Sequence, residues 1–294
     1  MEVYNFKLFR AFQPSFDEAG DEWKRRIFGV DYILLKGMQG GMLFLSRYGW
    51  PLADALRPRH WYVDGRFRET GQRLVGSTGS VYRMELPHRN SRGLPVVIKF
   101  NRFAQDAPVF YTIASQSEAA DNIARGARFL SPFEEFGLLQ DLRASHKTQP
   151  GRTPIWTQRP LAIYCPATRY PAWKLGRKEN AYWRYDRALA ADQRDQPEEK
   201  RVVYEWDRVY ITLFNWVKGV DAQDAAESGV ISDETMVKLS RNVNKELSER
   251  GFRVLDNKPR HIILRPHGRS GRPKAFRGQL PYALIDYELL ERGE

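Results

Sequence analysis

The feature that most constrains this chain is a capped amphipathic helix followed closely by three short apolar runs, all within residues 232–286. Ser232 occupies a helix N-cap position before two acidic residues, and Gly251 is a stop signal. Between them, apolar residues recur every three or four positions, which is the period of one helical face. The runs FRVL, HIILR and YALID then predict strands. This unit predicts a mixed α+β protein.

Composition narrows the class of protein further. Hydrophobic side chains make up 42% of the 294 residues and aromatic ones 13%, which excludes wholesale disorder and suits one large domain or two lobes. Lys and Arg number 47 against 36 Asp and Glu, a formal net charge of +11. That balance favours an anionic partner such as a phosphate, a nucleotide or an acidic surface. Because acids and bases are mixed along the chain, an ordinary basic surface is the alternative.

The cysteine content and the lengths of the apolar segments indicate the cellular compartment in which the protein is expected. The single cysteine, Cys165, has no partner for an internal disulfide and is expected to be a small buried hydrophobe in a reducing compartment. The N-terminal stretch lacks a signal-peptide pattern, and the most apolar stretches, near residues 32–35 and 42–45, are too short to span a bilayer. We therefore expect a cytoplasmic protein without a membrane span.

Two features between residues 72 and 100 suggest a phosphate site. The run GSTGSVY, which starts at Gly76, lies between two predicted strands, and its glycines allow backbone N–H groups to face a phosphate. An ordinary hairpin turn is the alternative. Lys99 lies inside the apolar strand VVIKF. It is either a phosphate-binding ammonium held by an acidic partner or a lysine that points to solvent from a half-buried strand.

The segment SPFEEFGLLQDLR predicts a helix with Ser131 as N-cap and Pro132 in its first position. Two glutamates follow in the first turn. Glu135 is the candidate ion-pair partner that would orient Lys99. The alternative is an acid that only interacts with the helix dipole, a role for which Glu134 is equally suited.

Two carboxylates lie at the ends of the short C-terminal strands. Asp256 opens DNKPRHIIL, and Asp286 ends YALID. Carboxylates at strand ends that a short antiparallel ladder brings together can serve as a base and a magnesium ligand. Each could equally be an acid in a turn.

In this order, the motifs resemble the protein-kinase-like fold, which includes protein kinases and the aminoglycoside and choline phosphotransferases. VVIK resembles the strand lysine of that fold, and EFGLLQDL the helix that carries its glutamate. FNWVKG is similar to the hinge between lobes, DNKPRHIIL to the catalytic loop, and LIDYE to the metal-binding motif. The resemblance covers about residues 70–294.

The resemblance implies a nucleotide site in the first part of that range. Gly76, Ser77 and Gly79 would cover the phosphates of ATP. Lys99 would contact the same phosphates and pair with Glu135.

The resemblance also implies catalytic and metal-binding residues. Asp256 would accept the proton of the substrate hydroxyl, and Lys258 would steady the transferred phosphate. Asp286 would bind the divalent metal, magnesium or manganese, and His261 falls where the family has a metal-binding asparagine. A histidine suits manganese or zinc better than magnesium.

The sequence departs from the family pattern at several positions. Val254 replaces the histidine before the catalytic aspartate, Leu74 the first loop glycine, and Glu288 the glycine of the metal-binding motif. Only eight residues follow Asp286, so the family's activation segment and most of its C-terminal helices are absent from this sequence. The usual substrate site of the family therefore does not carry over.

The resemblance implies a two-lobed α+β protein-kinase-like fold with an abbreviated C-lobe. Residues 1–69 would form an N-terminal extension that packs on the small lobe. Residues 70–217 would form the N-lobe, with an insertion near 166–202, and residues 218–294 the C-lobe.

Three functions remain open at this point. The first is an ATP-dependent phosphotransferase acting on an unidentified hydroxyl acceptor, with a protein as one candidate. The second is a nucleotide-binding pseudokinase that regulates or scaffolds. The third is a basic nucleic-acid-binding protein, for which the acid-free loop 265–277 is the main argument. That loop carries Phe276 as its one aromatic residue, which disfavours nucleic acid, and a solvated hairpin loop is the alternative.

Overall fold

The computed structural model describes residues 13–37, 40–74, 80–88, 93–107, 127–148, 155–266 and 280–293. The chain divides into two compact units. Unit 1 comprises Met1–Gln105, Ser131–Gly137 and Arg159–Trp216, and unit 2 comprises Asp106–Leu130, Leu138–Gln158 and Val217–Glu294. Helices and strands are mixed along the chain, as predicted for an α+β protein.

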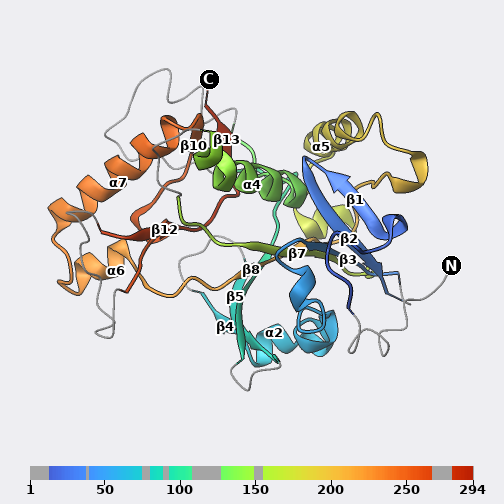
Figure 1. Ribbon diagram of the computed structural model, residues 1–294, viewed down its shortest axis with the longest axis horizontal. Helices are drawn as coiled ribbons and strands as arrows, with labels where there is room; N and C mark the ends of the chain where they lie inside the picture. The colour runs from blue at the N-terminus through green and yellow to red at the C-terminus, as the bar shows by residue number, and fades with distance from the viewer. Residues whose placement is uncertain are drawn as a thin grey trace. The chain divides into compact units, whose positions relative to one another are not determined.

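Unit 1 is built on an eight-stranded antiparallel sheet with the strand order β1-β2-β3-β7-β8-β6-β5-β4 (Figure 1). Its strands are β1 (Lys24–Ile27), β2 (Val30–Lys36), β3 (Met42–Ser46), β4 (Gln72–Arg73), β5 (Val81–Leu86), β6 (Leu94–Phe100), β7 (Pro160–Cys165) and β8 (Ile211–Asn215). The first three come from residues predicted to form an N-terminal extension, and β3 pairs with β7. The described part of that extension therefore continues the sheet.

A two-residue turn joins β1 to β2. Ile27 pairs with Val30, and the turn residues Phe28 and Gly29 have φ angles of 45° and 73°. Positive φ at both positions is typical of a type I′ turn, whose twist matches that of the flanking strands. The Phe28 N–H donates to the Asp192 carboxylate at 2.7 Å, which helps to hold a non-glycine residue in this conformation.

The alternation of side chains along β6 separates the two faces of the sheet. Val96, Ile98 and Phe100 lie on one face, and Val97 and Lys99 lie on the other. The first face packs on apolar residues of the N-terminal segment and of neighbouring strands, including Trp50, Leu56, Trp61, Phe67, Met84, Ile211 and Leu213. The second face carries an aromatic cluster of Tyr32, Phe44, Phe133, Phe136, Phe103, Tyr204, Tyr210 and Phe214.

The rest of unit 1 consists of short helices and the start of one long helix. The predicted insertion near 166–202 is partly helical, as expected. The α-helices are α2 (Arg66–Glu69), α5 (Glu179–Asp192) and the first residues of α4 (Pro132–Thr148). The 3-10 helices are η1 (Asp21–Trp23), η2 (Trp50–Leu52), η3 (Pro58–His60), η4 (Val63–Gly65), η6 (Ala172–Leu175) and η7 (Glu198–Lys200). Cys165 is fully buried, and burial raises the pKa of its thiol to about 11.

The described part of unit 2 contains two small antiparallel sheets, with strand orders β12-β11-β9 and β10-β13. The strands are β9 (Val220–Asp221), β10 (Phe252–Val254), β11 (Ile262–Leu264), β12 (Tyr282–Leu284) and β13 (Leu290–Arg292). The helices are α6 (Ala222–Glu227), α7 (Asp233–Ser248), the remainder of α4 and the 3-10 helix η8 (Pro259–His261).

Helix α7 has the ends that the sequence predicts. The Ser232 hydroxyl accepts a hydrogen bond from the Thr235 N–H at 3.2 Å, so Ser232 is the N-cap. Gly251 follows the helix with a φ of 74°, a left-handed conformation that glycine adopts without steric cost. Leu239, Val243 and Leu247 form the buried face of the helix.

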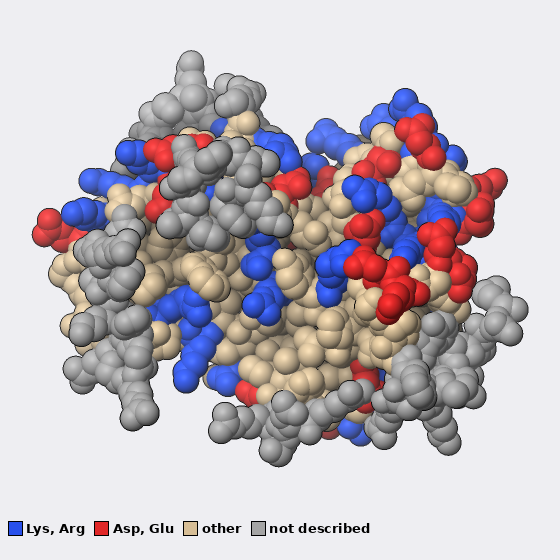
Figure 2. All heavy atoms as spheres, viewed as in Figure 1, with Lys and Arg blue, Asp and Glu red and all other residues tan. Residues whose placement is uncertain are grey.

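Two surface properties complete the description. In the parts of the chain that the structure describes, no helix is both long enough and apolar enough to cross a membrane. On the face that Figure 2 displays, the described Lys and Arg side chains form several separate groups, some beside Asp and Glu and some surrounded by other residues.

Candidate functional site

Lys99 lies near the end of β6 and points to the sheet face that carries the aromatic cluster. Its side chain is only 8% exposed, so the solvent-facing alternative is wrong. Lys99 is paired in register with Val81 on β5 and Thr212 on β8, which puts it in the interior of the sheet rather than at an edge. A charged amine at such a place needs a counter-charge, because desolvation penalises the ammonium form.

Glu135 supplies that counter-charge. Its Oε1 lies 3.3 Å from the Lys99 Nζ, and its side chain is 1% exposed. The structure thus brings together the two residues that the sequence nominated as an ion pair. Whether the pair contacts a nucleotide stays a prediction.

Glu134, the residue that seemed equally suited from sequence, has a different task. Ser131 Oγ accepts from the Glu134 N–H at 3.2 Å, and Glu134 Oε2 accepts from the Ser131 N–H at 3.0 Å. This reciprocal pair is a capping box, which satisfies two backbone donors at the start of α4. Glu134 therefore caps the start of the helix, and the next residue, Glu135, faces Lys99.

Contacts on several sides hold the first turns of α4 in place. The Tyr204 hydroxyl donates to Ser131 Oγ at 2.6 Å, and burial raises the pKa of Tyr204, which keeps that hydroxyl protonated. Phe136 packs on Phe214 with ring centroids 5.3 Å apart. At Gly137, an added Cβ would lie 2.7 Å from the backbone oxygen of Phe28, so only glycine permits this approach to the β1–β2 turn. These contacts fix the position of Glu135.

The unit 2 candidates lie on two connecting segments. Residues 255–261 lead from β10 to β11, and residues 285–289 lead from β12 to β13. Since β10 pairs with β13 and β11 pairs with β12, both segments join the same two ladders. Backbone hydrogen bonds extend the two ladders into these segments. The Leu255 N–H donates to the Leu289 carbonyl oxygen, and the Ile285 N–H donates to the His261 carbonyl oxygen. This topology brings His261 and Asp286 together.

The His261 Nε2 lies 3.6 Å from the Asp286 Oδ2, a distance too long for a hydrogen bond. His261 Nδ1 is buried and has no hydrogen-bond partner. Asp286 has a φ of 62°, in the left-handed region where non-glycine residues are uncommon. Such conformations cluster at functional sites, because the surrounding structure must maintain them at a cost.

Asp256 lies on the first connecting segment, after β10. Its Oδ2 accepts from the Lys258 Nζ at 2.8 Å, and the two side chains are 30% and 47% exposed. The structure therefore brings Asp256 and Lys258 together as an accessible ion pair. Asn257, between them, donates from its side chain to the Asn244 side chain of α7 at 2.5 Å, which ties the segment to that helix.

A resident metal would have few protein ligands here. Among the described residues, no group of three or more His, Cys, Asp and Glu side chains is placed to hold a metal ion. Magnesium at phosphoryl-transfer sites commonly takes one or two carboxylates, with substrate phosphates and water completing its shell. Asp286 is one such carboxylate, whereas the neighbouring His261 imidazole suits manganese better than magnesium, and a metal held by these two residues stays a prediction.

Part of the predicted site lies outside the described residues. Gly76, Ser77 and Gly79 fall there, as does most of the basic loop 265–277. The strands on either side of the glycine run are described, and β4 pairs with β5 as the predicted strand–turn–strand pattern requires.

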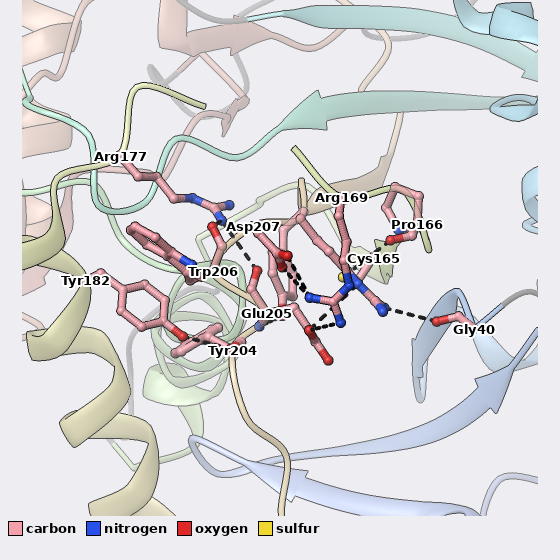
Figure 3. Close-up of polar contacts among 12 residues, drawn as sticks. Gly40, Cys165, Pro166, Arg169, Arg177, Tyr182, Tyr204, Glu205, Trp206 and Asp207 are labelled. Carbon is pink, nitrogen blue, oxygen red and sulfur yellow. Dashed lines mark hydrogen bonds and ion pairs between the residues drawn. The ribbon is translucent and has the colours of Figure 1, made fainter. Parts of the chain in front are cut away.

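Unit 1 contains a polar network around residues 169–208 that the sequence analysis did not predict (Figure 3). The signal that could have indicated it is the high content of Arg, Asp and Glu in this segment. Arg169 donates to both carboxylate oxygens of Asp207, at 2.8 and 2.6 Å, and to Glu205 at 3.1 Å. Arg177 donates to the backbone oxygens of Glu205 and Trp206, and Arg208 donates to Gly40. This network fixes the loop before β8 against the segment after β7.

Comparisons with known proteins do not assign a function to these residues. No known protein family and no curated protein matches the sequence. One of the solved structures that matches is described as WaaP in complex with acyl carrier protein. The alignment covers 80% of this chain and 69% of that chain, with 11% identity and a TM-score of 0.35.

Proposed function

We propose that this chain is an ATP-dependent, kinase-like phosphotransferase that moves the γ-phosphoryl group to a hydroxyl acceptor. The buried pair of Lys99 and Glu135 carries the proposal. A buried ion pair contributes little net stability, because desolvation of both charges offsets their attraction. A chain that needed only stability would be served as well by apolar residues at both positions. A lysine held by a carboxylate suits a different task, which is to present an ammonium to phosphate oxygens.

The residues of unit 2 support the remaining steps. When the acceptor oxygen attacks the γ-phosphorus, its proton passes to an Asp256 carboxylate oxygen, and the bond from the γ-phosphorus to the β–γ bridging oxygen breaks to release ADP. Lys258, whose Nζ lies 2.8 Å from the Asp256 Oδ2, would steady the transferred phosphate. His261 and Asp286 would hold a divalent cation, which would neutralise phosphate charge when bound.

The test is ATP turnover with and without Asp256. In the presence of magnesium or manganese, wild-type protein is expected to consume labelled ATP or to phosphorylate itself, and Asp256→Asn is expected to reduce that rate by about 10²–10⁴-fold with nucleotide affinity nearly unchanged. Asp195→Asn, at an exposed aspartate of unit 1, is the matched control and should keep the wild-type rate. Full turnover in Asp256→Asn would contradict the assignment of the base.

A nucleotide-binding pseudokinase is the second candidate. The sparse donor set at His261 and Asp286 favours it, because a weakened metal site would retain nucleotide and lose transfer. His261→Asn distinguishes the two functions, since an amide oxygen suits magnesium better than an imidazole. A phosphotransferase should keep or increase its magnesium-dependent turnover in this variant. Binding of ATP without turnover, in both wild type and variant, would favour the pseudokinase.

A further inference from the structure

Unit 1 contains a large cavity whose described lining includes none of the residues proposed for the transferase site. Its volume is about 1260 Å³, and it is lined by residues of the 35–43, 57–68 and 164–175 segments together with Ser80, Tyr82, Phe100 and Val209. Pockets for small organic ligands are typically about 300–1,000 Å³. This cavity therefore has room for a ligand larger than a single ring system.

The cavity lies on the sheet face opposite to Lys99 and Glu135. Phe100 lines the cavity, and successive side chains of a strand point to opposite faces, so its neighbour Lys99 points away. Tyr82, which also lines it, is paired in register with Ile98, on the same face as Phe100. A molecule in the cavity would thus be separated from the Lys99 amine by the thickness of the sheet.

One wall of the cavity is a chain of touching aromatic rings. Tyr164 lies 5.2 Å from Tyr62, Tyr62 lies 6.2 Å from Phe67, and Phe67 lies 5.1 Å from both Tyr82 and Phe100, measured between ring centroids. Burial, together with the neighbouring Tyr170 and Tyr164, raises the pKa of Tyr62 to about 12. The hydroxyl therefore stays neutral at physiological pH and does not repel an anion.

The charged lining is strongly unbalanced. Among the described lining residues, Asp64 is the single acid, against five basic residues: Lys36, Arg57, Arg59, Arg68 and Lys174. Asp54 lies 3.3 Å from both Arg57 and Arg59 and offsets part of that charge. Lys36, Arg68 and Lys174 are exposed and form no ion pair with any described carboxylate.

A second cavity of about 300 Å³ shares lining residues with the first, Lys174 and Phe100 among them. Its basic lining residues are Arg73, Arg102, Lys174 and Arg177, and no acid is among its described lining residues. Arg177 donates to the backbone oxygens of Glu205 and Trp206 (Figure 3). Its guanidinium carbon lies 4.1 Å from the centroid of the Phe103 ring. Burial lowers its pKa to about 10, which leaves it charged at neutral pH.

We infer that these adjoining cavities form a second binding site, for an organic phosphate whose apolar or aromatic body packs on the ring wall and whose phosphate group meets the basic side chains. A ligand with one carboxylate would neutralise only one of these positive charges. A phosphate monoester or diphosphate carries about two or more negative charges and matches the basic lining better. The aromatic rings of the wall favour a ligand with an apolar or aromatic part, because inorganic phosphate would leave these rings in contact with water. The site uses none of the described residues proposed for the transferase site, and its larger cavity lies on the sheet face opposite to Lys99.

Isothermal titration calorimetry with three probes tests the inference: ADP, the short-chain lipid dihexanoyl phosphatidic acid, and inorganic pyrophosphate. EDTA is present, so that metal-dependent binding elsewhere is suppressed. At least one of the two organic probes should bind with a dissociation constant below about 1 mM and more tightly than pyrophosphate. Binding of ADP alone would identify an aromatic body, and binding of the lipid alone an acyl body. Absence of saturable binding by both organic probes would overturn the inference.

Charge-reversal variants then locate the binding. Arg68→Glu/Lys174→Glu should weaken the organic probe by at least about tenfold, and added salt should weaken wild-type binding in the same direction. Lys238→Glu/Arg241→Glu makes the same charge change at exposed positions of α7 and should leave the affinity within about twofold of wild type. An equal loss in both double variants would assign the effect to net charge and overturn the site.

Ala167→Trp fills part of the cavity without changing any charge and should also reduce binding. A cooperative melting transition shows that each variant is folded. Lys99→Met/Glu135→Leu removes both charges of the buried pair on the opposite sheet face and should leave the organic probe bound. Loss of binding in this variant, with retention in Arg68→Glu/Lys174→Glu, would place the ligand on the other face and contradict the inference.

Discussion

At the scale of single residues, two adjacent glutamates in the same helical turn have separate tasks. Glu134 accepts a backbone N–H in the capping box, whereas Glu135 is buried against Lys99. Sequence reasoning could nominate both, because both are acids in a first turn. The choice depends on the direction in which each side chain leaves the helix, and that direction is set by where α4 lies over the sheet.

This division of tasks predicts unequal effects of equal substitutions. Glu135→Gln should reduce the free energy of unfolding by about 3–5 kcal/mol, because it leaves the buried Lys99 ammonium without its counter-charge. Glu134→Gln is the matched control and should cost little, since a glutamine at that position also closes a capping box. Urea denaturation gives both values. Lys99→Met/Glu135→Leu removes both charges and should be more stable than Glu135→Gln. Equal losses in the two single glutamine variants would contradict the assignment.

At the scale of elements, the start of α4 packs so closely on the β1–β2 turn that one helix position has no room for a side chain. Gly137 faces the backbone of Phe28, in the turn between β1 and β2. The helix and the hairpin therefore approach as closely as they do because this residue has no Cβ. That contact also makes the N-terminal strands a part of the support for Glu135.

Gly137→Ala should destabilise the protein although alanine is the better helix former. The new methyl group would lie 2.7 Å from the Phe28 oxygen, and the resulting shift should outweigh the gain of about 1 kcal/mol in helix propensity. A net loss of at least about 1 kcal/mol is expected in urea denaturation. Asn242→Ala, at an exposed position of α7, is the control for propensity alone and should be neutral or stabilising. A Gly137→Ala variant more stable than wild type would show that the β1–β2 turn moves to accommodate the methyl group without loss of stability.

At the scale of the whole molecule, the proposed machinery is divided between two compact units. Lys99 and Glu135 belong to unit 1, and Asp256, His261 and Asp286 belong to unit 2. A nucleotide that binds only the native chain would stabilise it by mass action, in proportion to the logarithm of its concentration over the dissociation constant.

ATP with magnesium or manganese should therefore raise the melting temperature. At a hundredfold excess over the dissociation constant, the stabilisation is about 2.7 kcal/mol, which a thermal-shift assay detects readily. Asp286→Asn should reduce the metal-dependent part of the shift, whereas Asp256→Asn should keep it. No shift with any nucleotide, in either metal, would remove the nucleotide site from the proposal and would favour a nucleic-acid-binding function.

Local signals in the sequence determined the elements. The caps at Ser131 and Ser232, the strand around Lys99 and the short strands before Asp256 and Asp286 all follow from patterns within a few residues of one another. Capping, turn chemistry and side-chain periodicity act over one or two turns of backbone, so a single sequence is enough to find them.

Only the tertiary structure decided which distant residues meet. It paired β3 with β7 and so joined the N-terminal strands to the sheet, and it placed Glu135 rather than Glu134 on Lys99, 36 positions earlier in the chain. It also brought His261 to Asp286 and lined a cavity with basic side chains from three separate segments. Such contacts depend on strand register and on the packing of helices over a sheet, which no local pattern encodes, because they are settled by the burial of the whole core at once.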